Sequence, residues 1–158
     1  MYTRNLLWLV SLVSAAPLYA ADVPANTPLA PQQVFRYNNH SDPGTLDPQK
    51  VEENTAAQIV LDLFEGLVWM DGEGQVQPAQ AERWEILDGG KRYIFHLRSG
   101  LQWSDGQPLT AEDFVLGWQR AVDPKTASPF AGYLAQAHIN NAAAIVAGKA
   151  DVTSLGVK

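Results

Sequence analysis

The stretch LQWSDGQPLTAEDFV, residues 101–115, places three acidic side chains and a tryptophan within one short segment. Such a segment either carries catalytic acids or uses its acids to shape the backbone. Asp105 and Gly106 have the composition of a turn. Thr110 has the position of a helix N-cap, and the Asp113 carboxylate, three residues later, can accept a hydrogen bond from the Thr110 N–H. The stretch therefore predicts a turn followed by a capped helix, and we interpret it as architecture rather than as a catalytic site.

The helix predicted to follow has an apolar stripe and a defined end. Glu112, beside Asp113, lies at the positive end of the helix dipole, so it also has a structural explanation. Asp123-Pro124 predicts the end of the helix, because proline cannot continue it. The apolar residues with helical spacing are Phe114, Val115, Trp118, Ala121 and Val122.

Upstream of this stretch, alternating patterns around glycine-rich turns predict two β-hairpins. The first joins residues 67–70 to 75–77 through Asp-Gly-Glu-Gly at 71–74. The second joins residues 84–87 to 92–98 through Asp-Gly-Gly-Lys at 88–91. Both connections contain the residues that tight turns require.

Before the hairpins, the sequence predicts a strand at Val34–Tyr37, a turn-rich stretch at 41–50 and a helix at Thr55–Phe64. Thr55 and Gln58 have the spacing of a capping box, and Gly66 can close the helix. The order of strand, helix, several strands and further helices predicts an α+β fold.

The first twenty residues have the layout of a secretory signal peptide. Arg4 precedes the apolar run Leu6–Val13, which is too short to span a membrane, and Ala20 suits a cleavage site. Residues 21–33 carry three prolines and are interpreted as an extended leader. Export to the periplasm is predicted, without membrane insertion after signal cleavage.

Composition excludes several classes of function. The formal charge of −6 becomes −7 when Arg4 leaves with the signal peptide, so a nucleic-acid partner or an anionic lipid surface is not expected. The chain contains no cysteine, which excludes disulfides and a thiol nucleophile. His40, His96 and His138 lack the spacing of a metal site, and no Gly-rich phosphate loop occurs. Neither a metal nor a cofactor is predicted.

Four tryptophans remain after the signal peptide, and packing is their expected role: Trp69, Trp84, Trp103 and Trp118. A set of tryptophans in a secreted protein could instead stack on sugars. Together with the acids, it leaves open a small secreted carbohydrate-active enzyme or sugar-binding module.

The sequence resembles the peptide-type extracytoplasmic solute-binding proteins, the substrate-capture subunits of peptide ABC importers. The segments that carry the resemblance are Leu46–Pro48, Leu63–Leu67, Ala81–Glu85, Tyr93–Arg98, Trp103–Phe114, Trp118–Arg120, Asp123–Pro129 and Leu155–Lys158. The last two of these are similar to the oligopeptide-binding branch and its murein-tripeptide-binding relatives.

The resemblance implies part of a periplasmic binding-protein type II-like fold. Residues 34–65 would begin ligand-binding lobe I, and residues 66–158 would form most of an extra domain that is incomplete at its C-terminus. It further implies an N-terminal fragment of a non-catalytic, monomeric protein that captures short peptides, including murein peptides, for an ABC permease in the inner membrane. An inert fragment is the remaining alternative.

The resemblance also implies where a peptide would bind. Glu52, Glu53 and Asn54 correspond to an extended stretch that lines the ligand cleft, with Glu52 placed to pair with a cationic peptide group. The same residues could simply form an acidic turn that leads into a helix. Phe130 occupies a position where relatives commonly carry tyrosine, so apolar contact is expected there without the hydroxyl's hydrogen bond.

Overall fold

The computed structural model describes residues 27–28, 31–32 and 34–158. The chain divides into two units, Met1–Tyr37 and Asn38–Lys158. The predicted signal peptide and most of the predicted leader lie outside the described residues. Within the part of the chain that is described, no helix has the length and apolarity needed to cross a membrane.

The strand predicted at Val34–Tyr37 is not formed. The segment carries exposed side chains, including Phe35 at 88% exposure, and the rings of Phe35 and Tyr37 stack 6.0 Å apart. A strand forms only where a neighbouring strand pairs with it, and an apolar local pattern does not supply that neighbour.

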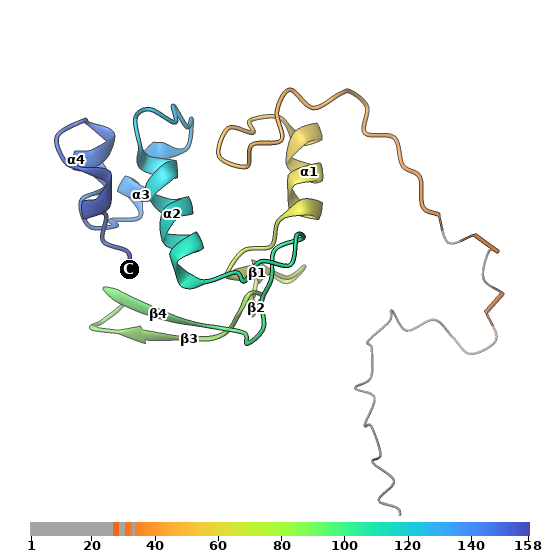
Figure 1. The fold of residues 1–158 in the computed structure, drawn as a ribbon, viewed down its shortest axis with the longest axis horizontal. Helices are drawn as coiled ribbons and strands as arrows, with labels where there is room; N and C mark the ends of the chain where they lie inside the picture. Colours follow the sequence, from red (N-terminus) through yellow and green to blue (C-terminus); the bar gives the residue numbers. More distant parts are fainter. Residues whose placement is uncertain (1–26, 29–30, 33) are drawn as a thin grey trace, which may run out of the picture. The chain divides into compact units, whose positions relative to one another are not determined.

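Helix α1 spans Asn54–Leu63 and starts earlier than predicted (Figure 1). The capping box at Thr55 and Gln58 is wrong, because Glu53 is the N-cap and Thr55 lies inside the helix. The Thr55 carbonyl accepts from Asn39 Nδ2 at 3.1 Å, and its hydroxyl lies 3.5 Å from that of Ser41, so Thr55 contacts the preceding turn. Gly66 does not end the helix, which already stops before the extended Phe64.

Both predicted hairpins are confirmed as separate antiparallel pairs. Strands β1 (Val68–Met70) and β2 (Val76–Pro78) pair Val68 with Pro78. Strands β3 (Ala81–Leu87) and β4 (Arg92–Leu97) form the longer pair, with a register irregularity between Ala81 and Arg83. Backbone bonds from Ala81 N to Leu67 O and from Arg98 N to Gln80 O link the two hairpins.

The turn and capped helix of residues 101–115 are also confirmed. Gln107 N donates to Asp105 Oδ1 at 2.9 Å, and Gln102 bridges to Pro108. Helix α2 spans Ala111–Val122, with Thr110 as its N-cap. The Asp113 carboxylate accepts from Thr110 N at 2.7 Å and from the Thr110 hydroxyl at 3.1 Å.

The principal apolar core lies where α2 contacts the C-terminal helices: α3 (Ala131–Gln136), α4 (Ala142–Val146) and the 3₁₀ turn η1 (Val152–Ser154). Figure 1 shows α3 and α4 beside α2. The buried residues of this core are Val122, Ala142, Ile145 and Leu155. Trp118 packs against this core as predicted, whereas Trp69 and Trp103 are about half exposed. For those two tryptophans, packing stays a prediction.

Candidate functional site

The loop before α1 is shaped by its own side chains. Asp47 N donates to the Thr45 hydroxyl at 3.1 Å, and Asp47 Oδ1 accepts from Gln49 N at 3.1 Å. Lys50 N closes the turn by donating to Asp47 O at 2.9 Å. Aspartate favours this local arrangement because its short carboxylate reaches the N–H two residues later.

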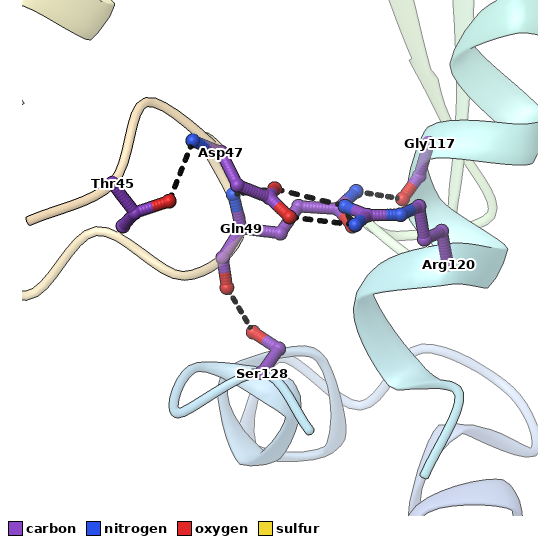
Figure 2. Close-up of polar contacts among 6 residues, drawn as sticks. All are labelled: Thr45, Asp47, Gln49, Gly117, Arg120 and Ser128. Carbon is purple, nitrogen blue, oxygen red and sulfur yellow. Dashed lines mark hydrogen bonds and ion pairs between the residues drawn. The ribbon is translucent and has the colours of Figure 1, made fainter. Parts of the chain in front are cut away.

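Arg120 of α2 connects this loop to the helix (Figure 2). Its Nη1 and Nη2 donate to Asp47 Oδ1 and Oδ2 at 2.9 and 2.6 Å, and Nη1 also donates to Gln49 Oε1 at 2.5 Å. The planar guanidinium matches both carboxylate oxygens at once. The hydrogen bond from Arg120 lowers the pKa of Asp47 to about 2, although burial acts in the opposite direction.

Two further bonds complete a cluster that we call the Asp47 clamp, made of Asp47, Gln49, Gly117, Arg120 and Ser128. Gln49 Nε2 donates to the Gly117 carbonyl at 2.5 Å, and the Ser128 hydroxyl donates to the Gln49 carbonyl at 2.7 Å. Figure 2 shows Gln49 between the helix and the Ser128 segment. The clamp joins segments that lie 68 to 79 positions apart in the chain.

The clamp lies close in sequence to the predicted ligand-contact residues. Glu52, Glu53 and Asn54 follow Gln49, and all three are exposed. Phe130 follows Ser128, is 49% exposed, and donates its N–H to the Ser128 hydroxyl at 3.2 Å. The structure therefore ties together the two segments that carry the predicted residues.

Glu53 has a structural role in this arrangement. Its Oε1 accepts from Gly44 N at 2.9 Å, and the residue is the N-cap of α1. These contacts agree with the alternative of a turn that leads into a helix. Contact between a ligand and Glu52, Asn54 or Phe130 stays a prediction.

Sequence reasoning missed the clamp itself. Asp47 lies in the turn-rich stretch predicted at 41–50, and Arg120 belongs to one of the motifs that carry the resemblance. Neither residue carries a local signal for the other, because they lie 73 positions apart in the chain. The usable signal was that Leu46–Pro48, Trp118–Arg120 and the Ser128 segment all belong to the motifs that carry the resemblance.

The remaining candidates for chemistry form no comparable site. Arg83 Nη2 lies 3.2 Å from His96 Nδ1, and His96 Nε2 lies 2.6 Å from Glu85 Oε1. Since a guanidinium can only donate, Nδ1 is the acceptor and Nε2 carries the hydrogen. The bond from His96 lowers the pKa of Glu85. Among the residues described, no group of three or more His, Asp or Glu side chains is arranged to hold a metal ion.

Residues 75–154 match the family model described as bacterial extracellular solute-binding proteins, family 5 Middle. This match covers half of the chain. The chain therefore belongs to the family 5 extracellular solute-binding proteins, as the motifs predicted. The predicted fold class, α+β and part of a type II-like binding-protein fold, is also confirmed by the solved relatives.

Curated relatives of this chain belong to the oligopeptide-binding and murein peptide-binding branch of the family. The chain is 49% identical over 150 residues to the periplasmic oligopeptide-binding protein OppA of Salmonella typhimurium, covering 95% of this chain and 27% of that protein. It is 46% identical over 149 residues to the periplasmic murein peptide-binding protein MppA of Escherichia coli, covering 94% and 27%. The chain thus spans about a quarter of the length of these relatives.

Solved structures share the fold. The Haemophilus influenzae OppA complex with the peptide RPPGFSPFR has a TM-score of 0.73 and 45% identity, over 77% of this chain and 24% of that chain. The unliganded open form of the murein tripeptide-binding protein MppA has a TM-score of 0.71 and 47% identity, over 73% and 22%. Both curated relatives are named as binding proteins.

Proposed function

We propose that this chain forms part of a periplasmic protein that captures oligopeptides and delivers them to an ABC importer in the inner membrane. The observation that carries the proposal is the 49% identity, across 95% of the chain, to an oligopeptide-binding protein. Export through a signal peptide cleaved after Ala20, a monomeric state and a permease partner belong to the same proposal.

The geometry supports a role for the clamp region in peptide contact. The Asp47 clamp fixes the loop before α1 and the segment before α3, so Glu52 and Phe130 are presented from restrained backbone. Glu52 would pair with a cationic peptide group, and Phe130 would provide an apolar surface. Recognition through peptide backbone groups would give affinity with little side-chain selectivity.

Native mass spectrometry of protein released from the periplasm of its host, without refolding, tests the proposal. We expect a species that begins at Ala21 and carries a spread of peptide-sized adducts. Protein that is folded, contains residues 21–158 and carries no peptide would overturn the capture function. A different N-terminal residue would overturn the proposed cleavage site alone.

Variants then locate the contact. Glu52→Gln should weaken binding of peptides with a free amino group, whereas Glu82→Gln, an exposed glutamate on β3, should not. Phe130→Ala should lower affinity and Phe130→Tyr should retain it, because the ring is kept. Equal affinities for all four variants would remove Glu52 and Phe130 from the site while leaving peptide capture intact.

A further inference from the structure

The dipeptide Asp-Gly occurs three times in this sequence, at residues 71–72, 88–89 and 105–106, and each copy lies in a turn. In such a pair the glycine nitrogen can attack the carboxyl carbon of the aspartate side chain, because glycine has no Cβ to obstruct the approach. The reaction requires a neutral carboxyl group and a glycine N–H that is free to leave its hydrogen bonds. The surroundings of each copy therefore decide how readily it reacts.

The first copy has its carboxylate held in place. Asp71 Oδ1 accepts from Glu73 N at 3.1 Å and from Gln75 N at 2.7 Å. Asp71 Oδ2 accepts from Gln77 Nε2 at 2.6 Å. The bond from Gln75 N, followed by the bond from Gln77, lowers the pKa of Asp71 and so disfavours the neutral form that reacts.

The last copy has its nitrogen held in place. Gly106 N donates to the Trp103 carbonyl at 2.9 Å, so this turn uses the atom that would attack. Asp105 Oδ1 accepts from Gln107 N at 2.9 Å, which also holds the carboxylate. Both hydrogen bonds have to break before Gly106 N can reach the Asp105 side chain.

The middle copy, in the turn between β3 and β4, has neither restraint. Within the part of the chain that the structure describes, no hydrogen bond engages the Gly89 N–H or the Asp88 carboxylate. The carboxylate instead forms an ion pair, with Asp88 Oδ2 lying 3.2 Å from Arg92 Nε. The two side chains are 60% and 61% exposed, so this pair is a weak restraint.

The backbone of this turn also leaves room for a reaction. Asp88 has φ +52° and Gly89 has φ +64°, and Gly90 N closes the turn by donating to the Leu87 carbonyl at 3.0 Å. The left-handed conformation is less favourable for aspartate than for glycine. A Cβ placed on Gly89 would meet nothing within 4 Å, so the turn can rearrange without displacing a neighbour.

We infer that Asp88-Gly89 is the site at which this protein spontaneously forms isoaspartate. Gly89 N bonds to Asp88 Cγ, and the amide proton leaves with the carboxyl hydroxyl as water, which closes a succinimide ring. Water then adds to one of the two ring carbonyls. Breaking the bond from Gly89 N to the main-chain carbonyl carbon gives isoaspartate, whereas breaking the new bond to Cγ restores aspartate.

The product changes the hairpin without changing its charge. Isoaspartate carries the main chain through Cβ, so the backbone of the turn becomes one carbon longer and the former main-chain carbonyl becomes the free carboxylate. That extra carbon lies between Leu87 and Gly90, whose hydrogen bond closes the turn. The inference is independent of peptide capture, because the reaction needs water and no ligand.

The test is to incubate the folded protein at physiological temperature in water enriched in the heavy oxygen isotope. Each ring opening leaves one solvent oxygen at the reacting residue, whichever product forms. After digestion in ordinary water, mass spectrometry with electron-transfer fragmentation locates the label and separates isoaspartate from aspartate. Label should accumulate at Asp88 at least about fivefold faster than at Asp71 or Asp105, because each of those must first release a hydrogen bond.

Two controls separate structure from sequence. Asp88→Glu keeps a carboxylate near Arg92 but requires a larger ring, so label at position 88 should disappear while Asp71 and Asp105 are unaffected. In concentrated urea the turns are lost, and the three Asp-Gly copies of the unsubstituted chain should incorporate label at similar rates.

Several results would overturn the inference. In the folded protein, these are equal labelling of the three copies, faster labelling at Asp71 or Asp105, and the absence of label or of isoaspartate at Asp88. A preference for Asp88 that persists unchanged in urea would have the same consequence, since it would come from the flanking sequence rather than from the free Gly89 N–H.

Discussion

Arg120 donates to both carboxylate oxygens of Asp47, a residue 73 positions earlier in the chain, at 2.9 and 2.6 Å. The Asp47 side chain is 23% exposed and that of Arg120 is 47% exposed. Ion pairs this accessible to water contribute modestly to stability. The two-point geometry nevertheless restrains the orientation of the loop against α2, which is what a preorganised binding surface requires.

Acid should weaken the contribution of this pair. The pKa of Asp47 is about 2 in the folded protein against an ordinary value of 3.8, so the unfolded chain takes up the proton first as the pH falls. The stabilisation is therefore fully present above about pH 4 and is lost as the pH approaches 2. Urea unfolding should be measured across this pH range. The difference in free energy of unfolding between wild type and Arg120→Gln should be largest at neutral pH and should shrink in acid.

Arg92→Gln is the control for that experiment, because it removes an arginine whose ion pair with Asp88 lies at the end of the second hairpin. It makes the same change in net charge without touching the Asp47 clamp. If the loss of unfolding free energy in Arg120→Gln is independent of pH, or is matched by Arg92→Gln, then Arg120 is not the cause of the low pKa of Asp47.

The cap of α2 makes a second prediction. Asp113→Ala removes the carboxylate that accepts from the Thr110 N–H, and should lower the free energy of unfolding by about 1 kcal/mol. Glu112→Ala removes an exposed acid from the same helical turn and should cost only about 0.3–0.5 kcal/mol through the helix dipole. Chemical denaturation of both variants measures the difference, and equal losses would show that the hydrogen bond adds nothing.

Local chemistry explains which predictions succeeded. The turn at Asp105, the cap at Thr110 and both hairpin turns depend on residues within a few positions of one another, so their patterns were sufficient. The capping box at Thr55 failed although its spacing was correct. Contacts to Asn39 and Ser41 place Thr55 within the helix, and tertiary contacts override a local pattern.

Long-range relationships explain what the sequence could not provide. The Asp47–Arg120 pair and the Ser128–Gln49 bond join segments more than seventy positions apart, and no local periodicity encodes them. The strand predicted at Val34–Tyr37 failed for the same reason, because pairing needs a distant partner. The resemblance identified the segments that carry the clamp, but not which of their side chains meet.

Two glycines should respond in opposite directions to alanine. Gly117 lies inside α2, and a Cβ there would meet nothing within 4 Å, so Gly117→Ala should stabilise the protein by about 0.5–1 kcal/mol. At Gly156 a Cβ would lie 2.5 Å from Asn140 Cβ, so Gly156→Ala should destabilise it by about 1–3 kcal/mol. Thermal and urea unfolding would test the sign of the stability change for each variant. A gain in stability for Gly156→Ala would show that Asn140 shifts readily to make room for the added Cβ.

Ser128 should control the local order of the Phe130 segment. Its hydroxyl donates to the Gln49 carbonyl at 2.7 Å and accepts from Phe130 N at 3.2 Å, so Ser128→Ala removes both contacts. Loss of one net hydrogen bond of about 1 kcal/mol corresponds to roughly fivefold faster exchange of the Phe130 amide. Hydrogen exchange followed by NMR measures this rate for the individual amide.

Ser128→Thr keeps a hydroxyl and should restore slow exchange at Phe130. The Tyr133 amide provides an internal reference, because it donates to the Phe130 carbonyl at 2.9 Å rather than to Ser128. Equal acceleration at Phe130 and Tyr133 in Ser128→Ala would indicate general loosening of α3. Selective acceleration at Phe130, reversed by threonine, would establish that the Ser128 hydroxyl orders the residue predicted to contact peptide.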